Sequence, residues 1–164
     1  MKKIIYLIHG FADWNGKLTT DLFCPYFEAL GWKVREWDYG FTLLPELLHN
    51  KKEATKLAGE ILSLLPDWIV VALAHSNGTR ITQLATFQGA LFHKMAWLSP
   101  ALDRGATVAH GVGKVLVYHS PLDVPVRIAR FLPFHPWGDM GAVGAQNTQA
   151  AISGCNRLCH CRNL

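Results

Sequence analysis

The stretch V-V-A-L-A-H-S-N-G-T at residues 70–79 does most to indicate the fold of this chain. An apolar run stops at Ser76, which has Ala74 two residues before it and Gly78 two residues after it. This pattern is typical of a nucleophile elbow, in which a strand ends, the serine adopts a strained backbone conformation and a helix begins at once. Small residues on both sides let the strand and the helix approach closely. We therefore predict a strand, an exposed Ser76 hydroxyl and a helix, in that order.

A second motif near the N-terminus points to the same kind of site. The apolar stretch at 4–8 ends in His9-Gly10-Phe11. Together with the elbow, this motif resembles an α/β-hydrolase, a family in which an early H-G-x segment supplies one backbone N–H to an oxyanion hole. The resemblance implies that Phe11 is this donor and that Asn77, directly after the serine, is the second one. The structural alternative is a strand-ending turn with an incidental histidine.

The third motif is K-V-L-V-Y-H-S-P-L-D at 114–123, followed by V-P-V. In α/β-hydrolases the acid of the catalytic triad follows a buried parallel strand, so the resemblance implies that Asp123 is the acid. The order of serine, acid and histidine along the chain would also match the family. A solvated turn aspartate after Pro121 is the alternative interpretation.

The histidine that would act as general base is the least well determined member of the triad. Only His135 and His160 follow Asp123 in the chain. His135 leaves little room for a further strand after the acid, whereas residues 146–164, which contain His160, have no apolar strand run. We take His160 as the candidate and His135 as the alternative. A third possibility is a hydrolase that is incomplete at its C-terminus and lacks a base.

The chain as a whole alternates strands with helices, which indicates an α/β fold with a mainly parallel sheet. Its 164 residues, half of them apolar, suffice for one domain. We expect a three-layer sandwich of about five or six strands without a large cap at residues 1–145, followed by a polar tail of uncertain order at 146–164. The expected strands are 3–8, 32–37, 68–74, 94–98 and 114–119. The expected helices run to Leu30 from an N-cap at Thr19 or Thr20, to Leu65 from an N-cap at Asn50, and from just after Ser76 to Phe87.

Charge and hydropathy exclude several classes of function. The formal net charge is +4, and the basic residues are scattered, so the sequence does not favour binding to nucleic acid. The apolar stretch after Met1-Lys2-Lys3 is too short for a signal peptide. No run of about 20 apolar residues is available to span a membrane. We therefore expect a cytoplasmic protein.

The cysteines do not indicate a disulfide framework or a metal site. Cys24 lies in the apolar pattern of an expected helix. Cys155, Cys159 and Cys161 surround His160, and three thiols with an imidazole could bind zinc. Ligands at adjacent positions point in divergent directions, however, so we expect no metal.

The family resemblance implies acyl transfer through Ser76 and a covalent acyl-enzyme, on ester bonds in preference to amides and without a cofactor. Asp13, Trp14 and Trp137 lie in loops after expected strands, where open α/β sheets bind ligands, so they are candidates to contact a small-molecule ester. Loop packing is their alternative role. The rival hypothesis is an inactive hydrolase-like scaffold that binds a ligand or a protein partner. The sequence does not indicate which ester is the substrate or whether the protein is oligomeric.

Overall fold

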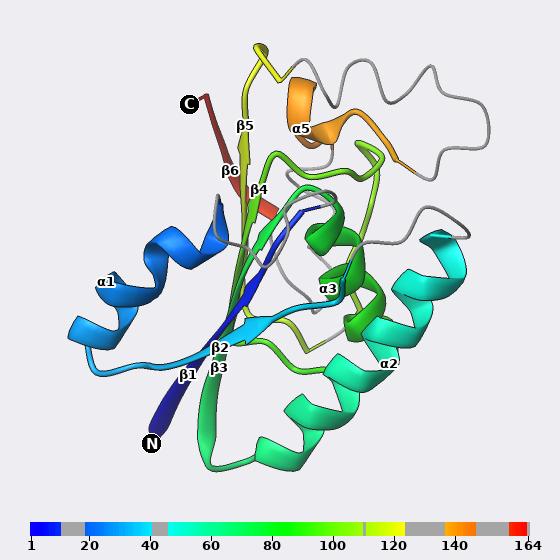
Figure 1. Ribbon diagram of the computed structural model, residues 1–164. Helices are drawn as coiled ribbons and strands as arrows, with labels where there is room; N and C mark the ends of the chain where they lie inside the picture. The colour runs from blue at the N-terminus through cyan, green and yellow to red at the C-terminus, as the bar shows by residue number, and fades with distance from the viewer. Residues whose placement is uncertain (11–18, 41–45, 110, 124–136, 147–157, 164) are drawn as a thin grey trace.

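The protein forms a six-stranded sheet in which all neighbouring strands are parallel, in the order β2-β1-β3-β4-β5-β6 (Figure 1). This computed structural model describes residues 1–10, 19–40, 46–109, 111–123, 137–146 and 158–163. The strands are β1 (Lys2–Ile8), β2 (Lys33–Trp37), β3 (Trp68–His75), β4 (Lys94–Leu98), β5 (Val115–His119) and β6 (Leu158–Asn163). The helices are a 3-10 helix η2 (Thr20–Phe23), α1 (Cys24–Ala29), α2 (Glu46–Leu64), α3 (Asn77–Phe87) and α5 (Met140–Val143). The predicted α/β fold with a parallel sheet is confirmed.

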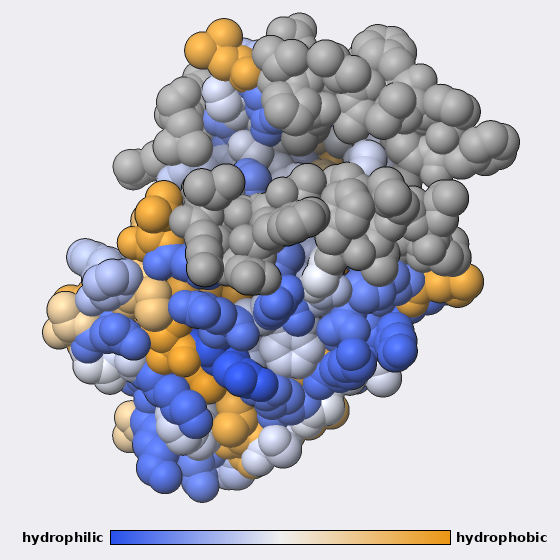
Figure 2. All heavy atoms as spheres, in the orientation of Figure 1, coloured by the Kyte–Doolittle hydropathy of each residue, from blue (hydrophilic) through white to orange (hydrophobic). Residues whose placement is uncertain are grey.

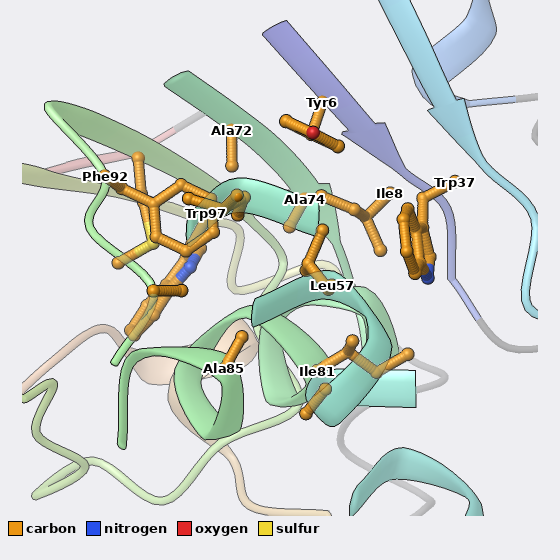
Figure 3. Close-up of a cluster of buried hydrophobic side chains, with 14 of the residues drawn as sticks. Tyr6, Ile8, Trp37, Leu57, Ala72, Ala74, Ile81, Ala85, Phe92 and Trp97 are labelled. Atoms are coloured by element: carbon orange, nitrogen blue, oxygen red, sulfur yellow. The ribbon is translucent and has the colours of Figure 1, made fainter. Parts of the chain in front are cut away.

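Helices cover both faces of the sheet, with α2 and α3 on one side and α1 on the other (Figure 1). Strand β1 shows why its sequence is apolar without a break. Ile4, Tyr6 and Ile8 pack in the larger core with α2 and α3, while Ile5 and Leu7 pack in a smaller core beside α1. Because successive side chains of a strand point to opposite faces, a strand buried on both faces needs apolar residues at every position. Figure 3 shows the larger core, in which side chains of the sheet meet those of α2 and α3.

Helix α2 is held to the sheet by an apolar stripe at helical spacing. Ala54, Leu57, Ala58 and Ile61 are at most 2% exposed. The outer side of this helix is mainly hydrophilic, as Figure 2 shows. The helix begins at Glu46, so the prediction that Asn50 caps its N-terminus was wrong. Asn50 lies inside the helix and its buried amide contacts another element, a contact that local sequence does not reveal.

The helix predicted from Thr19 or Thr20 to Leu30 is divided in two. Residues 20–23 form the 3-10 helix η2, and α1 begins only at Cys24. Pro25, in the first turn of α1, lacks an N–H and restricts the residue before it, which favours a break at this point. The N-cap residue Thr19 makes no side-chain capping bond, so the predicted cap was wrong. The helix does end before Gly31, whose φ of 74° suits glycine.

One strand lies outside the five that the sequence predicts. Residues 146–164 have no apolar strand run, yet β6 pairs in parallel with β5, with an irregular register between Val115 and Val117. An edge strand needs backbone pairing on one side only, so a segment without an apolar run can still form one. Between Leu98 and Val115 the described residues form neither helix nor strand. No helix within the described ranges is long and apolar enough to cross a bilayer.

Candidate active site

Ser76 joins β3 to α3 in a strained turn. Its φ of 48° and ψ of −118° are rare for a residue with a side chain and cost on the order of 1–3 kcal/mol. The surrounding backbone holds this conformation. The N–H of Ser76 donates to the carbonyl of Leu98 (3.0 Å), and the carbonyl of Ser76 accepts from the N–H (3.1 Å) and the hydroxyl (2.6 Å) of Thr79. Strand, strained serine and helix therefore follow one another as the sequence predicts.

The small residues around Ser76 are required by close packing against the end of β1. A Cβ added to Gly78 would lie 2.5 Å from the carbonyl oxygen of His9 and 2.6 Å from that of Ile8. A Cβ added to Gly10 would lie 2.7 Å from Nδ1 of His75 and 3.0 Å from Cβ of Ser76. Real Cβ atoms are essentially never found within 3.0 Å of such atoms. Residues His9 and Gly10 are thus in direct contact with the elbow.

The side chain of Asn77 is buried and uses its full hydrogen-bonding capacity. Its Nδ2 donates to Oδ1 of Asn50 (3.1 Å) and to the hydroxyl of Tyr39 (3.3 Å). Its Oδ1 accepts from Nδ2 of Asn50 (2.9 Å) and from the indole N–H of Trp137 (3.3 Å). An amide side chain offers two donor hydrogens and two acceptor positions, so this side chain has one orientation. The residue directly after Ser76 is therefore fixed from three other parts of the chain.

The His9-Gly10 turn is fixed on its other side by Tyr39. The Tyr39 hydroxyl donates to the carbonyl of His9 (3.1 Å), and the two rings stack with centroids 4.3 Å apart. The His9 ring nitrogen Nδ1 lies 2.8 Å from the carbonyl of Gly10, so it carries the proton and donates. The other ring nitrogen, Nε2, lies 3.5 Å from the carboxylate of Asp38. This histidine is 4% exposed, so its ring is part of the interior packing beside the elbow.

Sequence analysis assigned no role to Tyr39 and only that of a helix cap to Asn50. Asn50 carried a signal that could have been used, because it falls in register with the apolar stripe of α2, four residues before Ala54. A polar residue on a buried stripe needs a partner inside the protein. Tyr39 follows β2 and gave no comparable signal.

Asp123 follows β5, at the same edge of the sheet as Ser76. The strands β3, β4 and β5 are adjacent and parallel, so their carboxyl ends meet at one edge. Asp123 is half-buried, and its backbone N–H donates to the carbonyl of Ser120 (3.0 Å) in a turn. This is the edge at which open parallel sheets bind ligands.

The backbone of β6 places His160 far from the elbow. Cys161 pairs with Val117 of β5, Val117 with Trp97 of β4, and Trp97 with Ala74 of β3. His160 therefore lies three strands from β3, about 14 Å at ordinary strand spacing, and at a level before Ala74. That distance exceeds the reach of a histidine side chain.

Four of the predicted site residues, Phe11, Asp13, Trp14 and His135, lie outside the described residues. Trp137 is described, and its indole N–H contacts Asn77 beside the elbow. The ranges that the structure describes contain no group of three or more His, Cys, Asp or Glu side chains that could hold a metal ion. The four residues at 155 and 159–161 considered for zinc are not among the side chains described.

Comparison with known proteins supports the fold. No protein-family model matches the sequence. The structure is similar to the crystal structure of a protein from Xanthomonas campestris pv. campestris named as an α/β-superfamily hydrolase. The TM-score is 0.57 and the sequence identity 20%, over 73% of this chain and 72% of that one. At this identity the similarity establishes the fold and not the reaction.

The sequence is also similar to that of a protein whose name is not that of a hydrolase. The chain is 29% identical over 113 residues to a Trichodesmium erythraeum protein named protoheme IX farnesyltransferase. The match covers 67% of this chain but only 34% of that protein, so this chain spans about a third of its relative's length.

Proposed function

We propose that this chain is a serine hydrolase that cleaves esters, in preference to amides, through an acyl-enzyme on Ser76. The observation that carries the proposal is the strained Ser76 between β3 and α3, packed against the His9-Gly10 turn. A protein fold keeps such strain mainly where function requires it. An α/β-hydrolase fold with this serine at the edge of the sheet supports the same conclusion.

In the proposed reaction the Ser76 hydroxyl oxygen attacks the ester carbonyl carbon while a histidine accepts the hydroxyl proton. Asp123 orients the imidazole and stabilises its charged form. The backbone N–H groups of Phe11 and Asn77 donate to the carbonyl oxygen as it becomes negative. The tetrahedral intermediate then expels the alcohol, which takes the proton from the histidine. Water releases the acid by the same steps, with the histidine again as base.

Of the two candidate bases, the register of β6 favours His135. His160 belongs to a strand three positions away from β3, and its backbone lies before the level of Ala74. His135 belongs to the segment between Asp123 and Trp137. Asp123 follows β5 at the edge of the sheet where Ser76 lies, and Trp137 contacts Asn77 beside the elbow. We propose His135 as the base and keep His160 as the alternative that the experiments below distinguish.

We propose that the substrate is a small-molecule ester bound near Trp137, with Asp13 and Trp14 as further contacts. The contact between Trp137 and Asn77 supports this position for the aromatic ring. The chemistry needs no cofactor, and we expect the protein to act in the cytoplasm. None of the described site residues argues for prenyl transfer.

A fluorophosphonate probe tests the proposal, because it forms a covalent bond only with an activated serine. We expect labelling of the wild-type protein at Ser76 and hydrolysis of p-nitrophenyl acetate. Both should be lost in Ser76→Ala. The matched control is Ser99→Ala, since Ser99 also ends a strand and has a positive φ of 45°. This variant should be labelled like the wild type.

An unlabelled, folded wild-type protein would refute the proposal. In that case the rival hypothesis, an inactive hydrolase-like scaffold that binds a ligand or a protein partner, would replace it. Labelling that persists in Ser76→Ala would show that another residue is the nucleophile.

A further inference from the structure

A single hydroxyl bridges the residue directly after β1 and the residue directly after Ser76. The Tyr39 hydroxyl donates to the carbonyl of His9 (3.1 Å) and accepts from Nδ2 of Asn77 (3.3 Å). Asn77 carries one proposed oxyanion-hole donor, and the other, Phe11, lies outside the described residues. Tyr39 follows β2, which pairs with β1 but not with β3, so its hydrogen bond to Asn77 reaches across β1 to the end of a strand that β2 does not contact in the sheet.

Tyr39 is itself held firmly. Its ring stacks on the ring of His9 with an interplanar angle of 6°, and its carbonyl lies 2.9 Å from Nε2 of His49 in α2. The residue is 7% exposed. A hydroxyl in this setting has little freedom to turn away from its two partners.

Helix α2 fixes the elbow side of the bridge. Asn50 and Asn77 exchange two amide hydrogen bonds, of 2.9 and 3.1 Å, and both side chains are fully buried. A buried amide that loses a partner is left unsatisfied, so this pair resists any displacement of the residue after Ser76. The pair therefore restrains the backbone N–H of Asn77 relative to the body of the protein.

We infer that Tyr39 and Asn50 are positioning residues that hold the backbone N–H of Asn77, a proposed oxyanion-hole donor, in place against the end of β1. They do not touch the substrate and act through His9 and Asn77. The inference rests on the proposed function, because the position of this N–H matters only if an oxyanion forms there. Preorganised donors act mainly on the transition state, so loosening them should lower kcat and leave KM largely unchanged.

The test compares Tyr39→Phe with Tyr6→Phe. Tyr39→Phe keeps the ring that stacks on His9 and removes the hydroxyl, with its hydrogen bonds to His9 and Asn77. Tyr6→Phe is the matched control, since the buried Tyr6 hydroxyl also donates one hydrogen bond, to Glu60 (3.0 Å) on α2, away from the elbow. Removal of a donor itself costs about 10² to 10³ in rate, so a loosened donor should cost about tenfold. We expect kcat for p-nitrophenyl acetate to fall about tenfold in Tyr39→Phe, with KM within about twofold, and both constants to stay within about twofold in Tyr6→Phe.

A tetrahedral mimic supplies a second measurement that a merely structural role would not alter. Phenylboronic acid adds to an active serine and places an oxygen in the oxyanion hole. Its inhibition constant should rise in Tyr39→Phe by the same factor by which kcat/KM falls, and should not change in Tyr6→Phe. Concentrations of active enzyme are taken from fluorophosphonate titration, so that loss of folded protein is not counted as loss of rate.

The outcomes separate the inference from the proposed function. If the folded wild type is not labelled, the proposed function fails and this inference fails with it. If the wild type is labelled but Tyr39→Phe matches Tyr6→Phe in kcat and boronate affinity, only the inference is overturned. If Tyr39→Phe does not fold, Asn50→Ala decides the matter: a tenfold loss of kcat at constant KM supports the inference, and unchanged kcat overturns it.

Discussion

Replacement of Gly78 by alanine is the sharpest test of the packing that builds the site. The new Cβ would lie 2.5 Å from the His9 carbonyl oxygen, 2.6 Å from that of Ile8 and 2.8 Å from Cγ2 of Ile8. Two of these three atoms belong to backbone that cannot rotate away. Because contacts under 3.0 Å are essentially never found, the end of β1 must withdraw from the elbow by about half an ångström at the least.

The same substitution at Gly59 provides the matched control. Gly59 lies in α2, and a Cβ added there would meet nothing within 4 Å. Gly59→Ala should therefore raise the free energy of unfolding by about 0.5–1 kcal/mol, because alanine favours the helix. Gly78→Ala should lower it by about 1–3 kcal/mol through overpacking. The two alanines are thus expected to change stability in opposite directions.

Urea denaturation measures both effects, and ester hydrolysis measures the consequence for the site. A displacement near 1 Å at a catalytic centre can cost about 10² in rate, so Gly78→Ala should lose about that factor in kcat while Gly59→Ala keeps the wild-type rate. The reasoning is refuted if Gly78→Ala is as stable as Gly59→Ala. It is equally refuted if Gly78→Ala retains full activity, because then the contact between the turn and the elbow has no bearing on the site.

Four further predictions concern the rest of the protein. Asp123→Asn should lower kcat at pH 7 by about 10³ or more, since an amide cannot stabilise the imidazolium, and a rate near that of the wild type would place the acid elsewhere. His135→Ala should abolish turnover and His160→Ala should leave most of it, and the reverse result in steady-state assays would restore His160 as the base. Burial, reinforced by hydrogen bonding to glutamate side chains and by their negative charge, raises the pKa of the Cys24 thiol to about 11. In a variant with the other three cysteines replaced by serine, alkylation of Cys24 by iodoacetamide should therefore be slow at pH 8 and accelerate toward pH 11. An alkylation rate that reaches its plateau by pH 9 would contradict this. Leu57→Ala, at a fully buried position of α2, should lower the free energy of unfolding by about 2–5 kcal/mol in urea, and a loss below 1 kcal/mol would show that the core relaxes around it.

Much of the fold could be predicted because its signals are local. The expected strands at 3–8, 32–37, 68–74, 94–98 and 114–119 agree with β1 to β5 within one residue at each end. Buried parallel strands need unbroken apolar runs, and such runs are visible in the chain itself. The elbow was predictable for a similar reason, since the order of apolar run, serine and glycine describes a turn that few other residues allow.

The less regular elements could not be predicted in this way. Strand β6 depends on pairing with β5, and the early start of α2 at Glu46 shows a helix extended past the residue that could have capped it. In both cases contacts distant in sequence outweighed the local preference.

The sequence by itself determined that a serine would stand in a strained turn between a strand and a helix, because residue size and apolar periodicity act over a few neighbours. Only the tertiary structure decided how that turn is held. The contacts of Asn77 with Asn50, Tyr39 and Trp137 span 27, 38 and 60 residues of chain. A hydrogen bond between distant residues has no periodic trace in the sequence, because it depends on where folding brings two polar groups and not on what stands beside each of them.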